Sequence, residues 1–269
     1  MNNALVTNSS ATSPLRAGMC SVSFRKLTAE DIIALALRAR LQCIEWGGDV
    51  HAPVTAGAGR LKQIRDMTLD AGLSIASYGS YFRLQQHGHE DFGRVLEVMD
   101  QLGTRTVRIW PPRIASAMST DLDWKRAIEE TLAVSDLASA HQAEVSFEFH
   151  VGCLTDTVES AIRLMQSAAR SNLRMYYQVY LGGDPPVKSV RSLLPWLAHV
   201  HVAHCSGAIR HSLEEGACYW IPLVQELARS GKERALLLEF VKNDSQDQLL
   251  SDASTLRRWV NESAAIPHP

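Results

Sequence analysis

The sequence predicts a single α/β domain with the (β/α)8, or TIM-barrel, architecture. Short apolar runs alternate with amphipathic segments about eight times along the chain, which is typical of parallel βαβ units. The chain has 269 residues, and such barrels typically contain about 250 residues in one domain. Neither G-x-G-x-x-G nor G-x-x-x-x-G-K-[S/T] follows the first expected strand, which argues against the common nucleotide-binding folds. An open sheet with helices on both faces is the alternative.

The expected strands and helices follow one another in a regular order. The strands are short runs of β-branched and aromatic residues, namely residues 19–24, 43–46, 73–78, 106–110, 144–149, 173–179, 197–203 and 235–241. Between them, apolar residues recur at every third or fourth position, which predicts helices over residues 29–40, 59–72, 92–103, 123–141 and 157–170. Helix starts are indicated by Thr28, Asp156 and Thr157, and helix ends by Gly72 and Gly103.

Composition and charge narrow the range of partners. A formal net charge of −2 argues against nucleic acid, because nucleic-acid-binding domains normally carry a basic face. No apolar run approaches the roughly 20 residues that cross a bilayer, so we expect no membrane partner. The five scattered cysteines include no CxxC pair, which is typical of buried thiols in a reducing compartment. We therefore expect a cytoplasmic protein, with a small molecule as its partner.

The amino-terminal residues differ from the rest of the chain. Met1–Pro14 is rich in Asn, Ser and Thr, and it lacks the cationic start and apolar core of a signal peptide. We expect residues 1–17 to be a flexible extension and residues 18–269 to form one barrel domain.

Polar side chains interrupt the last four expected strands near their carboxyl ends. A buried parallel strand normally reads as an almost continuous apolar run. The exceptions are Glu148 in VSFEF, Gln178 in MYYQV, His201 in AHVHVA and Glu239 in LLLEFV. Singly, Glu239 fits an ion-pair partner of an arginine such as Arg108, and His201 fits a core histidine. Their equivalent positions favour a shared site, because barrel enzymes carry their chemistry at the carboxyl ends of the strands.

A divalent cation would explain this set of residues. A carboxylate buried in an apolar strand loses solvation energy, and two carboxylates that converge on one interior repel each other. One divalent ion offsets both effects, and oxygen and nitrogen ligands suit Mn²⁺, Mg²⁺, Co²⁺ or Zn²⁺. The sequence therefore predicts one divalent metal ion bound by Glu148, Gln178, His201 and Glu239.

The chain resembles the sugar phosphate isomerase/epimerase family of the xylose-isomerase-like TIM barrels over about residues 18–260. The stretches that carry the resemblance are IEWGGDVHAP (from Ile44), ASYGSYFRL (from Ala76), VRIWPP (from Val107), FEFHVGCLTDT (from Phe147), YYQVYLG (from Tyr176), VHVAHCSG (from Val200) and LLLEFVKND (from Leu236). The ordered set carries the match, since none of these stretches is a rigid signature alone.

The resemblance implies a metal site and a reaction. In the family, a Glu, an Asp, a His and a Glu after strands five to eight bind one metal, and these positions correspond here to Glu148, Gln178, His201 and Glu239. Gln178 departs from the usual Asp and is similar to a variant in one branch of the family. The implied reaction is proton transfer next to a carbonyl through an enediolate, with Glu148 and Glu239 as the catalytic acid–base pair.

Several residues near strand ends are candidates for binding a small carbohydrate. Trp46 ends the second expected strand and His51 follows it, beside glycines, and Trp110 ends the fourth, where its ring could form an apolar wall. His150 shares the strand face of Glu148 because side chains alternate along a strand. Arg210 follows the seventh strand and could bind a substrate oxyanion or phosphate. Each has an ordinary reading as well, as a packing residue or as a solvated loop residue.

The leading hypothesis is a metal-dependent isomerase or epimerase of a keto-sugar, a polyol or a sugar phosphate. A metal-dependent lyase or hydrolase on the same barrel is the second hypothesis. A non-catalytic sugar-binding barrel, with Gln178 as a trace of lost metal affinity, is the third. Metal content separates the third from the others, and deuterium uptake from solvent separates an isomerase from a hydrolase. A homo-oligomer is compatible with all three.

Overall fold

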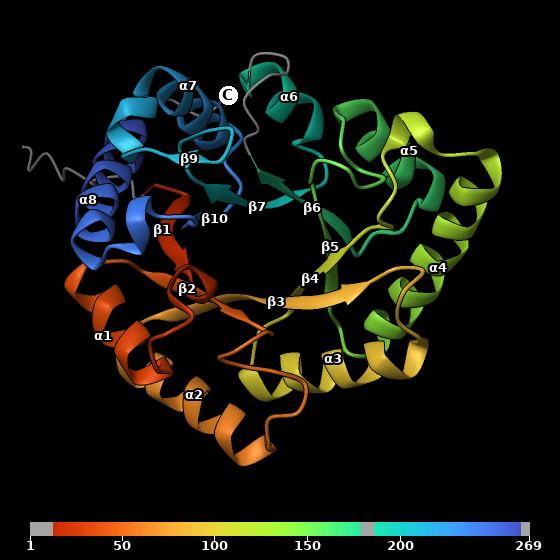
Figure 1. Ribbon diagram of the computed structural model, residues 1–269, viewed down its shortest axis with the longest axis horizontal. Helices are drawn as coiled ribbons and strands as arrows, with labels where there is room; N and C mark the ends of the chain where they lie inside the picture. The colour runs from red at the N-terminus through yellow and green to blue at the C-terminus, as the bar shows by residue number, and fades with distance from the viewer. Residues whose placement is uncertain (1–12, 179–185, 265–269) are drawn as a thin grey trace, which may run out of the picture.

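The computed structural model of the protein describes residues 13–178 and 186–264. Eight parallel strands close into a barrel in the order β1–β2–β3–β4–β5–β6–β7–β10, with β10 hydrogen-bonded to β1. Figure 1 looks along this barrel and shows the helices as a ring around it. The structure confirms the predicted fold class.

The barrel strands agree with the apolar runs of the sequence. They are β1 (Leu15–Cys20), β2 (Cys43–Gly47), β3 (Ser74–Arg83), β4 (Thr106–Trp110), β5 (Glu144–Glu148), β6 (Leu173–Gln178), β7 (Leu197–Val202) and β10 (Arg234–Leu238). The helices are α1 (Ala29–Arg38), α2 (Ala58–Asp70), α3 (His89–Leu102), α4 (Asp121–Ala140), α5 (Val158–Ala168), α6 (Pro186–Leu193), α7 (Ala217–Arg229) and α8 (Gln246–Ser263). Short 3-10 helices are η1 (Ser21–Phe24), η2 (Ser116–Met118), η3 (Leu213–Gly216) and η4 (Lys242–Asp244).

The first strand begins earlier than the sequence pattern indicates. The expected strand over residues 19–24 corresponds to the end of β1 followed by η1. Pairing with β10, which matches Leu15 with Arg234 and Met19 with Leu238, fixes the register of β1. The alternation after Cys20 instead reflects a buried turn. The barrel thus includes Leu15, in the segment expected to be an extension; residues 1–12 lie outside the described residues.

Local signals at the helix ends act as the sequence indicates. The side chain of Thr28 accepts a hydrogen bond from the backbone N–H of Asp31 and caps α1. Thr157 caps α5 in the same way. Gly103 ends α3 with φ 72°, a left-handed conformation that favours glycine.

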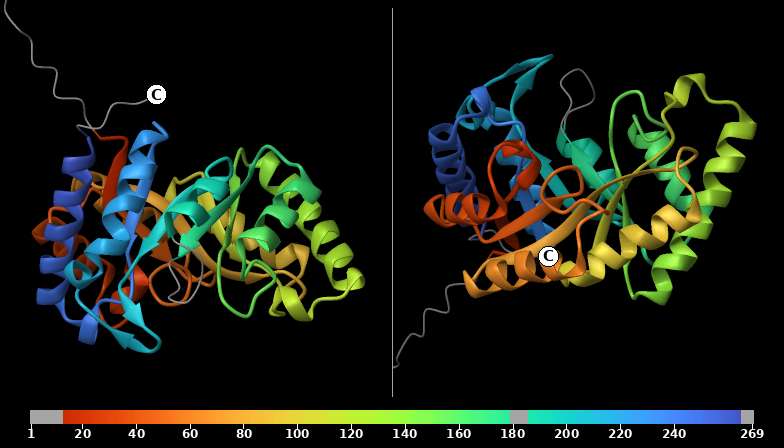
Figure 2. Two further views of the ribbon diagram at one scale, coloured as in Figure 1. Left: turned by 90° about the horizontal axis from the view of Figure 1, so that it is seen from above. Right: turned by 60° about the horizontal axis from the view of Figure 1, so that its bottom comes forward.

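A short hairpin follows β7 and is not part of the barrel. It consists of β8 (Cys205–Ser206) and β9 (Ile209–Arg210), which pair antiparallel. Figure 2 shows this hairpin projecting beyond one end of the barrel. The turn contains Gly207 at φ 58°, which suits the backbone twist of a tight hairpin. The hairpin holds Arg210 above the carboxyl ends of the strands.

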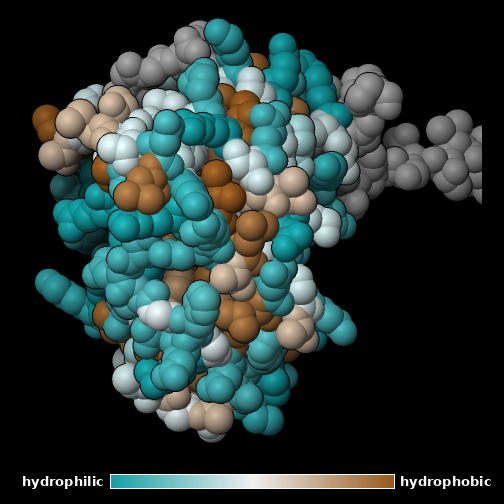
Figure 3. All heavy atoms as spheres, turned by 90° about the vertical axis from the view of Figure 1, so that its right-hand side faces the viewer, coloured by the Kyte–Doolittle hydropathy of each residue, from teal (hydrophilic) through white to brown (hydrophobic). Residues whose placement is uncertain are grey.

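The apolar core fills the space between the strands and the surrounding helices and is continuous around the barrel. The outer surface over α4 and α5 is mostly hydrophilic, with small hydrophobic groups between (Figure 3). None of the described helices is both long enough and apolar enough to span a bilayer.

Candidate active site

Four polar side chains from neighbouring strands meet at the carboxyl end of the barrel. Glu148 and Gln178 are the last residues of β5 and β6, His201 lies near the end of β7, and Glu239 follows β10. Nε2 of Gln178 donates a hydrogen bond to Oε2 of Glu239 at 2.9 Å. Nδ1 of His201 lies 3.3 Å from that oxygen and 3.9 Å from Oε1 of Glu148. The structure therefore brings the four predicted ligands together, all of them buried.

Two further buried charged residues belong to the same cluster, namely Glu45 in β2 and Arg108 in β4. Neither is among the predicted site residues. Nε of Arg108 donates to Oε1 of Glu45 at 3.2 Å, and its Nη1 donates to Oε2 of Glu148. Nε2 of His201 lies 3.3 Å from Oε1 of Glu45. Arg108 thus forms ion pairs with Glu45 and Glu148 rather than with Glu239, the partner that the alternative interpretation of Glu239 offers.

Small residues in β3 make room for Glu45 and orient it. A Cβ at Gly79 would lie 2.7 Å from Oε1 of Glu45 and 2.8 Å from Nη2 of Arg108, so a larger residue would displace this ion pair. The hydroxyl of Ser77 donates to Oε2 of Glu45 at 2.7 Å, and the hydroxyl of Tyr176 donates to Ser77 at 2.6 Å. Both oxygens of Glu45 therefore have fixed donors.

The electrostatic potential in the cluster is negative. Burial would raise the pKa of Glu45, but Arg108 and His201 outweigh it and hold that pKa well below its usual range. Burial alone would lower the pKa of His201, yet the carboxylates of Glu239 and Glu45 raise it to about 9. Burial raises the pKa of Glu239, and His201 offsets only part of this effect. The cluster therefore favours a positive charge between its carboxylates.

The residues of this cluster fit a divalent metal ion. Both ring nitrogens of His201 are buried 3.3 Å from a carboxylate oxygen, without a well-aligned hydrogen bond within the described part of the chain, and a buried nitrogen in such a position is stabilised by a closer partner. Three carboxylates against the one guanidinium of Arg108 leave a formal charge of −2, which one divalent cation balances. Carboxylate, amide and imidazole donors suit Mg²⁺, Mn²⁺, Co²⁺ or Zn²⁺.

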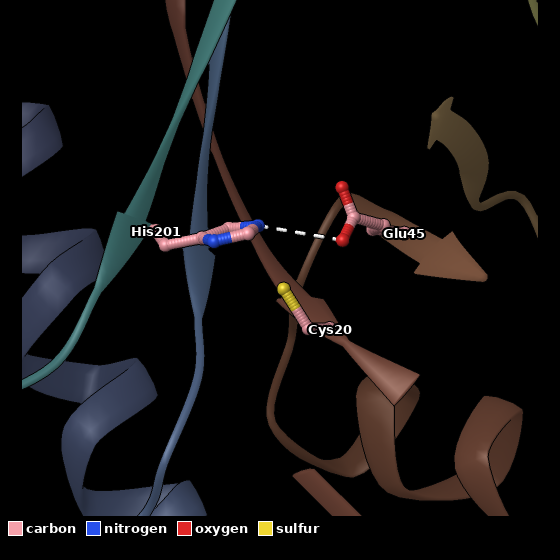
Figure 4. Close-up of side chains that lie close together, drawn as sticks. All are labelled: Cys20, Glu45 and His201. Carbon is pink, nitrogen blue, oxygen red and sulfur yellow. Dashed lines mark ion pairs between the residues drawn. The ribbon is translucent and has the colours of Figure 1, made fainter. Parts of the chain in front are cut away.

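Cys20, at the end of β1, is buried beside the cluster. Its Sγ, a carboxylate oxygen of Glu45 and a ring nitrogen of His201 all lie within 4.8 Å of one another. Figure 4 shows the thiol directed toward the space between the imidazole and the carboxylate. Burial raises the pKa of Cys20, and the nearby carboxylates raise it further. The protonated thiol is a weak ligand, so we place the candidate metal among the oxygen and nitrogen donors.

A cavity of about 380 Å³ opens beside Gln178 and His201. His150 and Arg210, two of the predicted substrate-binding residues, line it, together with Phe240. Nδ1 of His150 donates to the backbone carbonyl of Val151 at 2.8 Å, which fixes the ring. The half-buried ring of Trp110 packs edge-on against His150, with ring centroids 4.8 Å apart. Trp110 therefore supports the wall of this cavity through His150.

Trp46 and His51 occupy a different environment. Trp46 is fully buried, His51 is nearly so, and their rings pack against each other with centroids 5.9 Å apart. Nε2 of His51 donates to the backbone carbonyl of Leu27 at 3.0 Å. Neither side chain lines the cavity beside Gln178. Burial in the packed layer leaves both side chains without an exposed face toward this cavity, and their expected contact with substrate stays a prediction.

His199, two residues before His201 in β7, lies in the core. Its Nδ1 accepts a hydrogen bond from the backbone N–H of Ala235 at 3.1 Å, and its Nε2 donates to the carbonyl of Ala76 at 3.3 Å. Burial lowers the pKa of His199 to about 4, so the ring is neutral. The contrast with His201, two residues later, is sharp, because both nitrogens of His199 are satisfied by backbone groups.

The sequence and the fold are similar to those of known proteins. Residues 33–259 match the family described as xylose isomerase-like TIM barrel. No curated protein matches the sequence significantly. A probable 3-DHS dehydratase, AsbF from Bacillus anthracis, is similar at a TM-score of 0.78 and 20% identity, covering 90% of this chain and 98% of that one. An L-ribulose 3-epimerase is similar at a TM-score of 0.74 and 14% identity, covering 93% and 95%.

A xylose isomerase-like TIM barrel protein from Mycobacterium smegmatis, in complex with magnesium, is also similar. Its TM-score is 0.72 and its identity 13%, over 95% of this chain and 99% of that one. At these identities, the structural similarity concerns the fold alone, whereas the family match covers most of the sequence. The chain belongs to the xylose isomerase-like TIM barrel family.

Proposed function

We propose that this protein is a metal-dependent isomerase or epimerase of a small carbohydrate, acting by proton transfer next to a carbonyl group. The observation that carries the proposal is the environment of His201. Both its ring nitrogens are buried without a hydrogen bond in the described chain, while carboxylates from β2 and β5 and the carboxylate of Glu239 surround it. A cluster of this kind is suited to hold a cation and to move a proton.

Glu148, Gln178, His201 and Glu239 would hold one divalent ion. Because Nε2 of Gln178 donates to Glu239, the amide oxygen would be the atom of Gln178 that binds the ion. When bound, the ion polarises a substrate carbonyl and stabilises the negative charge that develops as a proton leaves the adjacent carbon.

The protein's own residues divide the remaining work. Glu239 removes or returns the proton, because its carboxylate accepts from the neutral amide of Gln178 and burial raises its pKa. Glu148 serves the opposite face of the substrate, with its carboxylate held in place by Arg108. His150 and Arg210 contact substrate oxygens from the cavity wall, and Trp110 positions His150. With two bases on two faces the product is an epimer, and with one base it is an aldose–ketose isomer.

The structural neighbours support this class of chemistry and supply one alternative. L-ribulose 3-epimerase, D-psicose 3-epimerase and 3-keto-D-glucoside 4-epimerase are among them. The probable 3-DHS dehydratase favours a lyase as the second candidate, since dehydration next to a carbonyl starts with the same proton removal. The two candidates separate at the product, because a lyase releases water and an epimerase conserves the atoms of its substrate.

The decisive experiment measures exchange of substrate hydrogen with solvent. Purified protein, stripped of metal and then loaded with Mn²⁺, Co²⁺, Mg²⁺ or Zn²⁺, is incubated in D₂O with ketoses and sugar phosphates. We expect one deuterium on the carbon next to the carbonyl in recovered sugar, with loss of this exchange on metal removal. Glu226→Gln is the matched control, because it removes a carboxylate of α7 that pairs with Arg191 of α6. This variant should exchange normally. Absence of both bound metal and exchange would contradict the proposal.

A further inference from the structure

A second cavity, which we call the outer cavity, adjoins the candidate active site. It has a volume of about 510 Å³ and lies between the segment after β1, the segment after β10 and the β8–β9 hairpin. Its walls include Arg25, Lys26, Arg210, Phe240 and Asp244. Arg210 and Phe240 also line the cavity beside Gln178 and His201. A ligand longer than a few atoms can therefore reach from one cavity into the other past these two residues.

The outer cavity carries an excess of positive charge. Three cations line it, whereas Asp244 is the one carboxylate among its lining residues. Arg25 is already engaged by Asp49 and by the hydroxyl of Tyr81. Lys26 is exposed and makes no ion pair in the described part of the chain. Lys26 and Arg210 are thus the cations on which a ligand can draw.

Arg210 is held by contacts that a ligand can replace at small cost. Its Nη1 donates to Oδ1 of Asp244 at 2.5 Å and to the carbonyl of Val241 at 3.3 Å, and its guanidinium lies 5.3 Å from the centroid of the Phe240 ring. The Asp244 side chain is 67% exposed, and exposed ion pairs contribute little to stability. An incoming anion can displace this carboxylate into solvent while the guanidinium keeps its orientation over the ring.

The loop after β10 is strained at the point where the two cavities meet. Phe240, Asn243 and Asp244 have positive φ angles of 54°, 59° and 50°. The left-handed region is uncommon for a bulky residue such as phenylalanine and is found mainly where the surrounding structure enforces it. Here it turns the ring of Phe240 to the boundary between the cavities, directly after the candidate base Glu239. The strain places an aromatic platform between the reacting end and the cationic end of a ligand.

We propose that the substrate carries an anionic group, a carboxylate or a phosphate, that binds Arg210 and Lys26 in the outer cavity. Its carbonyl end then lies over Phe240 at the metal-ligand cluster. This inference rests on the proposed function for the carbonyl end only, because the cationic walls of the outer cavity are a separate observation. It narrows the substrate class from small carbohydrates in general to acidic sugars.

Three ketoses that differ at one carbon test this proposal. D-fructose, D-fructuronate and D-fructose 6-phosphate carry a hydroxymethyl, a carboxylate and a phosphate group at carbon 6. Their dissociation constants are measured calorimetrically on the metal-loaded full chain. We expect at least one anion to bind about tenfold or more tightly than D-fructose, since charge-assisted hydrogen bonds are the strong ones. The anion that gains affinity identifies the acidic group, and the gain should shrink with added salt.

Single substitutions assign the gain to the outer cavity. Arg210→Gln and Lys26→Gln should each reduce the ratio of anion to fructose affinity several-fold, and the double variant should bring the ratio close to one. Lys242→Gln is the matched control. Lys242 lies in the loop after β10, pairs with Glu215 and does not line the outer cavity. This control should keep the wild-type ratio. Lys26 is exposed and Arg210 and Lys242 are partly exposed, so the variants should fold normally.

The outcomes separate this proposal from the proposed function. Equal or undetectable binding of all three ketoses, or an anion preference that survives in the double variant, overturns the outer cavity as an anion site. Metal-dependent deuterium exchange into neutral ketoses would still support the proposed function in that case. Conversely, an anion preference that depends on Arg210 and Lys26 without any metal-dependent exchange supports the outer cavity and contradicts the proposed function.

Discussion

On one side of the barrel interior, β2, β4 and β5 carry Glu45, Arg108 and Glu148; on the other side, Gln178 ends β6, His201 lies in β7 and Glu239 follows β10. The first group neutralises much of its charge internally, because one guanidinium binds two carboxylates. In the second group, the carboxylate of Glu239 lies beside the neutral amide of Gln178 and an imidazole that makes no hydrogen bond within the described residues. We call these groups the arginine side and the histidine side.

The difference between the two sides indicates which part of the site depends on a metal. A buried carboxylate needs a counter-charge, and the arginine side has a permanent one in a guanidinium that stays protonated at any physiological pH. The histidine side has a counter-charge only when His201 takes up a proton or when a cation binds. Loss of metal should therefore change the geometry of the histidine side. The arginine side should keep its geometry and stabilise the metal-free protein.

The largest expected effect is on turnover, and it tests whether the two sides share the chemical step. Glu239→Gln and Glu148→Gln each keep an oxygen ligand but lose the ability to accept a proton at neutral pH. We expect each to lower turnover by about 10²–10⁴-fold, measured against Glu226→Gln. If the bases serve opposite faces, one variant still incorporates deuterium without completing epimerisation. Wild-type turnover in both metal-loaded variants would show that the two-glutamate mechanism is wrong.

The second prediction concerns stability without metal. Arg108→Met leaves Glu45 and Glu148 buried with no guanidinium, so it should lower the free energy of unfolding of the metal-free protein by about 3–5 kcal/mol. At a pH above about 9, where the imidazole of His201 is neutral, His201→Leu removes no counter-charge and should lower the free energy of unfolding far less. Urea denaturation of both variants checks this contrast. Adding Glu45→Gln to Arg108→Met should recover part of the loss; equal destabilisation by Arg108→Met and His201→Leu would remove the distinction between the sides.

These two sides also show how much the sequence can predict. Glu148, Gln178, His201 and Glu239 are recognisable because each interrupts an apolar strand near its carboxyl end. The same signal exists in the earlier strands, where a glutamate interrupts CIEW and an arginine interrupts VRIW. Applied to all eight strands, it would have identified the arginine side as well.

Other features depend on contacts that no local pattern reveals. The partners of Arg108 lie 63 and 40 residues away, so sequence spacing does not connect them. The start of β1 is set by pairing with β10 rather than by the alternation of its own residues. Trp46 and His51 resemble binding residues in a glycine-rich loop, yet their burial is decided by how that loop packs. Strand order follows from the alternation of elements, whereas these contacts require the closed barrel.

The third prediction concerns the metal itself. At a free metal concentration of about 100 times its dissociation constant, binding should raise the free energy of unfolding by about 2.7 kcal/mol. Thermal denaturation with and without Mn²⁺, Co²⁺, Mg²⁺ or Zn²⁺ measures this gain. In His201→Leu, most of the gain should disappear. A gain of the same size in His201→Leu would place the metal outside the cluster, and no gain with any ion in the wild type would remove the metal from the site.

The smallest expected effect belongs to Gln178, which joins the histidine side through its hydrogen bond to Glu239. Gln178→Asp exchanges a neutral oxygen donor for a charged one, so metal affinity should rise, by about tenfold for each 1.4 kcal/mol gained. Gln178→Leu removes the donor and the hydrogen bond, so affinity should fall. Calorimetric titration with Mn²⁺ compares the three proteins. Because one more negatively charged ligand makes the ion a weaker Lewis acid, the Asp variant should bind metal more tightly yet turn over more slowly. Equal affinities across all three would exclude Gln178 as a ligand and leave it as the orienting partner of Glu239.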